Sequence, residues 1–225
     1  MFNAGPVIDN CLLRDNYLYG WNGSPFGGAI AGELSNPIIK NCEIIWNRFR
    51  DGSGIGFANN SHVYLENSTI ANNLAYYNGG AIYLQESSAS IINCNIADNT
   101  ADYGAGIYLN NSNSIHISQC EIVSNESSRY GGGLYAFESH FSTENVVISD
   151  NESEKGGGIF LNYSHFDGNG LRIVNNAADY GGGIYFQNCP DTLFNHDGYI
   201  SIYDNSASEG QNLYYKSEYI PSSHY

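Results

Sequence analysis

The stretch IINCNIADNTADYGAGIYL, residues 91–109, contains the two motifs that decide the fold. In the first motif an aliphatic residue, Ile96, is followed three positions later by Asn99. In the second, a glycine-rich turn leads directly to Ile107. The stretch ISQCEIVSNESSRYGGGLYA, residues 117–136, repeats both motifs in the same order. A fixed period of roughly 25 residues indicates an array of stacked supersecondary units.

Both motifs recur along nearly the whole chain. The glycine motif ends at Ile30, Ile55, Ile82, Ile107, Leu134, Ile159, Ile184 and Leu213. The asparagine motif ends at Asn16, Asn47, Asn73, Asn99, Asn125, Asn151, Asn176 and Asn205. Short alternating runs such as GGIYF favour strands, and sustained helical periodicity is missing. We predict an all-β fold: a right-handed, single-stranded parallel β-helix (β-solenoid), pectin-lyase-like, with about eight coils of roughly 25 residues, forming a single domain over residues 1–225.

Each coil is predicted to contain three short strands, for example around 89–91, 94–96 and 105–109. The aliphatic residues of the glycine motif should face inward, as should a second column of Leu84, Leu109, Leu161 and Phe186. A tight turn between two strands is predicted at Asn10, Asn41, Asn67, Asn93, Gln119 and Asn145, because Asn tolerates left-handed backbone geometry. Stacked coil on coil, these amides and the eight motif asparagines should form side-chain ladders.

The cysteines have a position in the repeat. Cys11, Cys42, Cys94 and Cys120 share one slot with Ser68, Val146, Leu171 and Ile200. Because aliphatic residues fill the same slot, we interpret these cysteines as buried thiols. A zinc site is the alternative, but no His falls in the slot and no CxxC pair occurs. Cys189 lies outside this column and has no assigned role.

Composition excludes several partners. The chain of 225 residues has 8 Lys and Arg and a formal net charge of −15, so nucleic acid and anionic membrane surfaces are not expected partners. No apolar run approaches the roughly 18 residues of a membrane span, and the start MFNAGPVIDN lacks the features of a signal peptide. We therefore expect no membrane insertion by this chain, which we interpret as a fragment of a longer exported protein. No metal and no cofactor are predicted.

The paired motifs resemble the repeats of chlamydial polymorphic outer-membrane proteins and related bacterial surface β-helix repeats, whose motifs are GGAI and FxxN. GGAI occurs literally at residues 27–30 and 79–82, whereas Leu or Ile replaces Phe throughout the second motif. Such repeats form the passenger region of surface-attached adhesins. The resemblance therefore implies an extracellular or cell-surface setting.

An aromatic column is the strongest candidate for a binding surface. It contains Tyr83, Tyr108, Tyr135, Phe160, Tyr185 and Tyr214, and a looser stripe just before the glycines contains Phe26, Tyr103, Tyr130 and Tyr180. We expect the column to point outward, where its rings could stack on sugar faces. The alternative, which we favour, is cross-strand stacking that only stabilises the sheet.

Two loops depart from the repeat. The first, YLYGWNGSPF at 17–26, contains Tyr17, Tyr19, Trp21 and Phe26, and the second, NCPDTLFNHDG at 188–198, precedes the last coil. Trp21 is predicted either to make a specific ligand contact or to fold over the first coil as a lid. Both interpretations stay open.

Catalytic residues are harder to find. Asp98, Asp150 and Asp204 occupy alternate coils and are interpreted as turn residues, although glycosidases need two nearby carboxylates. The histidines His62, His116, His140, His165, His196 and His224 do not share one column of the repeat, and the arginines are isolated.

The sequence therefore predicts a non-catalytic secreted or cell-surface module, adhesin-like or part of an extracellular matrix, whose partner is a polysaccharide or a host or cell-surface glycan. One alternative is an extracellular filament subunit that self-associates by stacking coil ends, because the first coil has an uncovered edge. The other is a polysaccharide lyase or glycoside hydrolase of the β-helix type.

Overall fold

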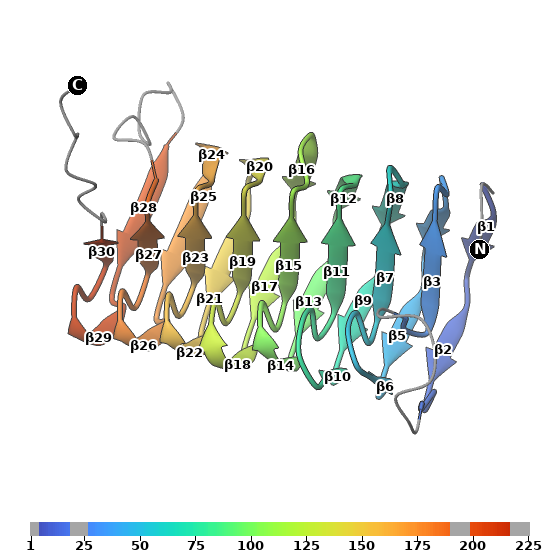
Figure 1. The fold of residues 1–225 in the computed structure, drawn as a ribbon, viewed down its shortest axis with the longest axis horizontal. Coiled ribbons are helices and arrows are strands. Elements are labelled where there is room, and N and C mark those ends of the chain that lie inside the picture. The colour runs from blue at the N-terminus through green and yellow to red at the C-terminus, as the bar shows by residue number, and fades with distance from the viewer. Residues whose placement is uncertain (1–4, 19–26, 190–198, 217–225) are drawn as a thin grey trace, which may run out of the picture.

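The computed structural model describes residues 5–18, 27–189 and 199–216. In this part of the chain every regular element is a β-strand, and no helix is present that could span a membrane. The strands of successive coils lie side by side along a rod, from β1 and β2 at one end to β29 and β30 at the other (Figure 1). The predicted β-solenoid is confirmed.

Four parallel sheets run along the rod. Sheet A contains β3 (Ile30–Glu33), β7 (Ile55–Ala58), β11 (Ile82–Gln85), β15 (Ile107–Asn110), β19 (Leu134–Phe137), β23 (Ile159–Asn162), β27 (Ile184–Gln187) and β30 (Leu213–Lys216). Sheet B contains β1 (Val7–Asp9), β4 (Ile38–Lys40), β8 (His62–Glu66), β12 (Ser88–Ile92), β16 (Ile115–Ser118), β20 (His140–Glu144) and β24 (His165–Asn169).

The other two sheets complete each coil. Sheet C contains β2 (Leu12–Arg14), β5 (Glu43–Ile45), β9 (Thr69–Ala71), β13 (Asn95–Ala97), β17 (Glu121–Val123), β21 (Val147–Ser149), β25 (Leu171–Val174) and β28 (Ile200–Tyr203). Sheet D contains β6 (Arg48–Phe49), β10 (Leu74–Ala75), β14 (Thr100–Tyr103), β18 (Glu126–Tyr130), β22 (Glu152–Lys155), β26 (Ala177–Tyr180) and β29 (Ser206–Glu209). A full coil therefore follows the order B, C, D, A.

The prediction of three strands per coil is wrong, because a full coil contains four. The missed strand belongs to sheet D, where residues 100–103 were expected to form a connection rather than β14. The inward residues of this sheet are small, such as Ala101 and Ser127, so the strand lacks the alternation of large apolar residues that marks the other three.

The core is formed by the columns that the repeat predicts. Residues of the glycine motif pair in register, for example Ile82 with Ile107, and Ile107 with Leu134. From Ile30 to Ile184 these side chains are buried, as are Leu84, Leu109, Leu161 and Phe186 of the second column. Leu213, on the last strand of sheet A, is 43% exposed. Since each buried aliphatic side chain stabilises the fold by roughly 1.5–3 kcal/mol, stacking of coils supplies most of the stability.

The motif asparagines form a continuous ladder at the turn between sheets C and D. Each Nδ2 donates to the Oδ1 of the asparagine in the next coil, from Asn16 to Asn205, at 2.8–3.0 Å. The backbone N–H of each asparagine donates to the same Oδ1, and from Asn47 onward the Nδ2 also donates to a backbone carbonyl of the preceding coil. The ladder thus satisfies buried polar groups that the turn would otherwise leave unpaired.

A second amide ladder was predicted at the turn between sheets B and C, and it forms only in part. Asn93 donates to Asn67 at 2.7 Å and Asn67 donates to Asn41 at 3.5 Å. At the next step Asn41 donates to Asp9, at 2.8 Å, rather than to Asn10. The predicted left-handed backbone is confirmed, with φ between 49° and 54° at Asn10, Asn41, Asn67, Asn93, Gln119 and Asn145.

A serine ladder, which the sequence analysis missed, forms the turn between sheets A and B, here called the serine corner. The backbone N–H of each serine donates to the hydroxyl of the serine in the next coil at 3.0–3.3 Å, through Ser35, Ser61, Ser87, Ser112, Ser139 and Ser164. Cys189 occupies the next position, and its sulfur lies within hydrogen-bonding distance of the carbonyls of Leu161 and Gln187. The previously unassigned cysteine therefore replaces a serine of this ladder.

The remaining cysteines are free thiols, and those in the described interior slots are buried as predicted: Cys42, Cys94 and Cys120. Cys11, on the first described coil, is exposed. Among the described residues no group of three His, Cys, Asp or Glu side chains is arranged to hold a metal ion.

Candidate functional site

The predicted aromatic column is a continuous stack of rings on the outer side of sheet A. Neighbouring rings lie nearly parallel, with centroid separations of 4.9–5.3 Å, in the order Tyr83, Tyr108, Tyr135, Phe160, Tyr185 and Tyr214. Strand pairing sets this spacing, because the six residues are partners in register. The stack is therefore a rigid feature of the sheet.

The expectation that this column is exposed is wrong for four of its six rings. Phe160 is 0% exposed, Tyr185 3%, Tyr83 7% and Tyr135 9%, whereas Tyr108 and Tyr214 are partly exposed. Most of the stack is therefore internal packing.

The physical reason lies in sheet D, whose last residues lean over the column. Tyr130 stacks on Phe160 with centroids 4.7 Å apart. Tyr103 packs edge-on against Tyr135 at 5.9 Å. In both pairs the covering ring comes from the position just before the glycines, one coil before the ring that it covers. The column and the looser stripe therefore form two layers rather than two independent strips.

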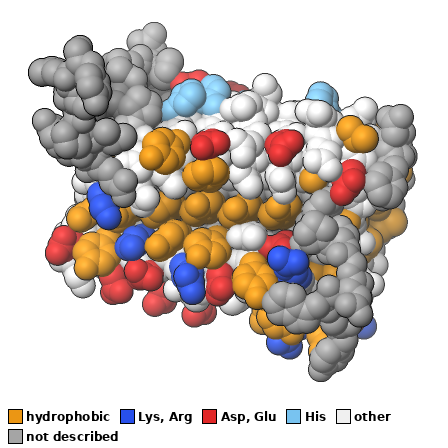
Figure 2. All heavy atoms as spheres, in the orientation of Figure 1, with side chains coloured by type: hydrophobic (Ala, Val, Ile, Leu, Met, Phe, Trp, Pro, Cys, Tyr) orange, Lys and Arg blue, Asp and Glu red, His pale blue; other side chains and the backbone are white. Residues whose placement is uncertain are grey.

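The outer layer contains the partly exposed tyrosines and the basic side chains beside them. Lys155 takes the position of Tyr130 in the next coil, and its Nζ lies 4.9 Å from the centre of the Tyr130 ring. Arg129 lies beside Tyr103, with Nη1 3.2 Å from the phenolic oxygen. We call Tyr103, Tyr108, Tyr130, Tyr180 and Tyr214, together with Arg129 and Lys155, the aromatic face. Figure 2 shows a band of hydrophobic side chains along the rod with Lys and Arg side chains beside it.

Burial changes the acid–base chemistry of the column. It raises the pKa of Tyr83 from 10.0 to about 12, helped by the negative charge of Asp51. Burial is also the main cause of the raised pKa of Tyr108 and Tyr135, and neighbouring tyrosines add to it. The stack therefore contains neutral phenols whose ionisation is strongly disfavoured.

We expect the protein to lose stability as the pH rises above 10. Between pH 10 and about 12 the unfolded chain releases phenolic protons that the folded chain retains, so the unfolded state is favoured progressively. Urea denaturation at a series of pH values, with tyrosinate absorbance recorded in parallel, measures the effect. Replacing Tyr83 with Phe should make the loss shallower, and an identical slope in this variant would contradict the assignment.

The other predicted site residues lie away from the aromatic column or outside the described residues. Trp21, Tyr19, Phe26 and the loop 190–198 lie outside the described residues. Tyr17 is described and is 44% exposed, with the Arg48 guanidinium 5.9 Å from its ring centre. Asp98, Asp150 and Asp204 have φ of 55°, 57° and 53°, as expected for turn residues, and they lie between sheets C and D rather than beside the aromatic face.

The histidines are more organised than the sequence analysis expected. All four in the described part of the chain lie on sheet B, where strand register pairs His62 with Ser88 and His140 with His165. Ser114 precedes β16 and lies between these two pairs along the sheet. The His140 and His165 rings stack at 4.1 Å, and His140 Nε2 lies 3.0 Å from Asp167 Oδ2. Burial, with His140 as the second cause, lowers the pKa of His165. This arrangement was missed because two serine-bearing coils separate His62 from His140.

Comparison with known protein families assigns the chain to a family. A family model described as a right handed beta helix region matches residues 3–141 and 77–210, two overlapping segments that cover most of the chain. The chain belongs to the right-handed beta helix family. Membership in the right-handed beta helix family agrees with the four parallel sheets and the asparagine ladder. A search of curated proteins gave no match. A shared architecture does not by itself assign an activity.

Proposed function

We propose that this chain is a non-catalytic, secreted or cell-surface β-helix module that binds an extended glycan along the aromatic face. The observation that supports this most is the pairing of two aromatic layers: a buried stack fixes the inner rings, and partly exposed tyrosines lie over or beside it. The surface setting extends the resemblance to bacterial surface repeats and is part of the proposal.

The geometry suits a carbohydrate for two reasons. Tyrosine rings offer apolar faces for sugar rings and hydroxyls for hydrogen bonds. These rings are also held in place by their neighbours, as Tyr130 is by Phe160 at 4.7 Å and by Lys155 at 4.9 Å. A ligand that binds such a surface therefore loses little free energy to ordering side chains.

Repetition sets the shape of the ligand. Equivalent positions in successive coils are about 4.8 Å apart, so the partly exposed tyrosines form an elongated strip parallel to the rod. A linear polysaccharide contacts several coils at once, whereas a compact ligand contacts one or two. We infer that affinity comes from many weak, repeated contacts.

The test is a triple variant, Tyr103→Ser, Tyr130→Ser and Tyr180→Ser, assayed by affinity electrophoresis in gels that contain individual soluble polysaccharides. If each ring contributes about 0.5–1.5 kcal/mol, binding should weaken roughly 10-fold or more. The matched control is Tyr64→Ser, since Tyr64 lies on sheet B and is 36% exposed. Thermal unfolding of each variant separates lost binding from lost folding.

Two results contradict the proposal. Equal binding by the triple variant and the control would remove the aromatic face as the glycan site. Release of oligosaccharides in a parallel depolymerisation screen would support the alternative, a polysaccharide lyase or glycoside hydrolase.

A further inference from the structure

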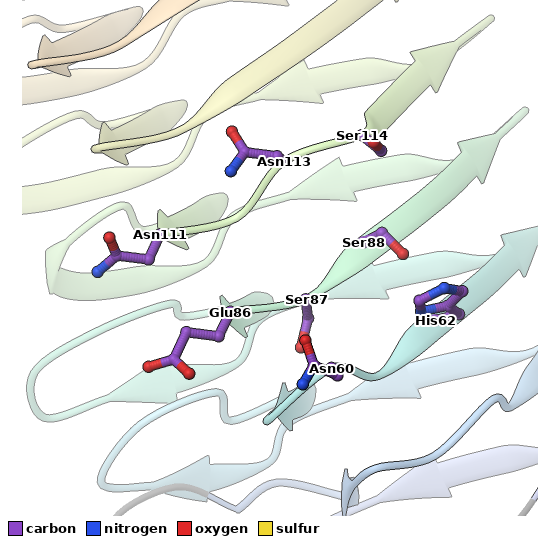
Figure 3. A pocket seen from close by; sticks show the side chains of 8 residues that line it. All are labelled: Asn60, His62, Glu86, Ser87, Ser88, Asn111, Asn113 and Ser114. Atoms are coloured by element: carbon purple, nitrogen blue, oxygen red, sulfur yellow. The ribbon is translucent and has the colours of Figure 1, made fainter.

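A separate concave site lies at the serine corner, across sheet A from the aromatic face. This corner notch has a volume of about 420 Å³, within the range of small-molecule sites. It is lined by Asn60, His62, Glu86, Ser87, Ser88, Asn111, Asn113 and Ser114 (Figure 3).

The notch exists because two corners are one residue longer than their neighbours. A regular corner has one left-handed residue followed by the ladder serine, as in Glu86–Ser87 and Glu138–Ser139, where φ is 47° at Glu86 and 45° at Glu138. In the coil of β7, two left-handed residues, Asn59 and Asn60, precede the ladder serine. The lengthened corner on one side of Glu86 therefore forms one wall.

The opposite wall comes from the coil of β15. There Asn113 is inserted after the ladder residue Ser112 and before Ser114, which has φ of 59°. The regular corner of β11 and β12 lies between the two lengthened ones and forms the floor. Ser87 holds this floor in place, since its N–H donates to the Ser112 hydroxyl at 3.2 Å and its own hydroxyl donates to the carbonyl of Gln85 at 2.8 Å.

The walls carry unused hydrogen-bonding groups. Within the part of the chain that the structure describes, five lining side chains make no hydrogen bond to another residue: Asn60, His62, Ser88, Asn113 and Ser114. Together they offer amide, hydroxyl and imidazole groups, and both donors and acceptors. None of the eight lining side chains is apolar, and Glu86 supplies the only carboxylate.

We propose that the corner notch binds a single uncharged sugar residue, such as the terminal pyranose of a glycan. A pyranose presents several hydroxyls, each both donor and acceptor, in different directions. Figure 3 shows a matching arrangement: Glu86 and Asn111 lie on one side, and His62 and Ser88 lie on the other. This site does not depend on the aromatic face.

Other ligands fit the notch less well. A calcium ion needs six to eight oxygens that converge on one point and usually several carboxylates, whereas these side chains spread apart. An anionic ligand would meet Glu86 in a chain of net charge −15. Covalent catalysis by a Ser–His–Glu triad is also unsupported, since no hydrogen bond joins His62 to Ser87, Ser88 or Glu86 in the described structure.

The test uses the methyl glycosides of glucose, galactose, mannose and N-acetylglucosamine, with methyl glucuronide as the anionic comparison. Amide chemical-shift perturbation in the whole chain should show at least one neutral probe binding at the notch, with a Kd on the order of 1 mM. The glucuronide should bind more weakly than its neutral counterpart, methyl glucoside.

Variants locate the site. Deleting Asn113 restores the regular corner length and should weaken binding at least tenfold, as should filling the notch with Ser88→Trp. Glu86→Gln should weaken binding about fivefold, because a hydrogen bond to a charged group is the stronger one. Glu138→Gln is the matched control, since Glu138 has the same left-handed corner geometry but does not line the notch.

The proposal is overturned if none of the four neutral glycosides perturbs the notch, or if binding survives unchanged in a folded Ser88→Trp variant. Perturbations confined to the aromatic face would also overturn it, while leaving the proposed function intact. Loss of polysaccharide binding in the tyrosine variants, with notch binding retained, would show that the two sites are separate.

Discussion

Replacing Asn125 with alanine should lower the free energy of unfolding by about 2–5 kcal/mol. Asn125 is 1% exposed and lies in the middle of the ladder. Its Oδ1 accepts from Asn99 Nδ2 at 2.9 Å and from the Asn99 backbone N–H at 3.1 Å. Its Nδ2 donates to the Ile96 carbonyl and to Asn151 Oδ1, both at 3.0 Å. Alanine removes all four interactions, and the buried Asn99 backbone N–H loses its acceptor.

Urea denaturation followed by far-ultraviolet circular dichroism measures this loss, with thermal unfolding as a second probe. The matched control is Asn95→Ala in the preceding coil. Asn95 is exposed on β13, and its replacement should change stability by no more than about 0.5 kcal/mol. Equal effects of the two substitutions would show that the ladder contributes little beyond the packing of neighbouring strands.

The sequence predicts the ladder and the core because both depend on equivalent positions meeting in successive coils. Asn99 contacts Asn125 for the same reason that Ile96 pairs with Ile122. Once the period is known, each column is known, and its chemistry follows from the residue type that fills it. The buried cysteines were predictable on the same ground, since their slot also holds aliphatic residues.

Features that depend on contacts between sheets were not predictable in this way. The column at Tyr135 and Phe160 has the periodicity of an outward face, yet rings from sheet D cover it. The period of the repeat does not show that the outward side chains of sheets D and A approach each other at the glycine turn that joins these sheets. The fourth strand was not predicted, because the inward residues of sheet D are small or polar and give no apolar alternation. Ser127, for example, faces inward, and its hydroxyl donates to the carbonyl of Asp102 at 2.7 Å.

The lengthened corners that form the notch are visible in the sequence as longer intervals between glycine motifs. The intervals from Ile55 to Ile82 and from Ile107 to Leu134 are longer than the interval between them, and each contains one lengthened corner. In a regular solenoid a local excess of one residue must project outward, because the ladders on both sides fix the register. A longer interval between glycine motifs therefore indicates a projection on the surface, whereas the constant part of the repeat indicates the core.

Replacing Gly156 with alanine is expected to destabilise the fold by roughly 2–6 kcal/mol, through left-handed strain together with overpacking. Gly156 has φ of +65°, and an added Cβ would lie 2.4 Å from the Ile159 oxygen and 2.9 Å from the Phe160 Cα. The repeat itself supports this. The first position of the glycine motif is glycine in every coil: Gly27, Gly52, Gly79, Gly104, Gly131, Gly156, Gly181 and Gly210.

The two following positions are not restricted in this way, which supplies the control. The second accepts Ser53 and Ala105, and the third accepts Ala29 and Ala81. Gly158→Ala, at the third position, places a Cβ 2.6 Å from the Gly183 oxygen, but Ala81 shows that a coil can adjust to this side chain. Its cost in urea denaturation should be less than half that of Gly156→Ala. Equal costs would mean that close packing between coils, rather than the left-handed turn, makes the first glycine necessary.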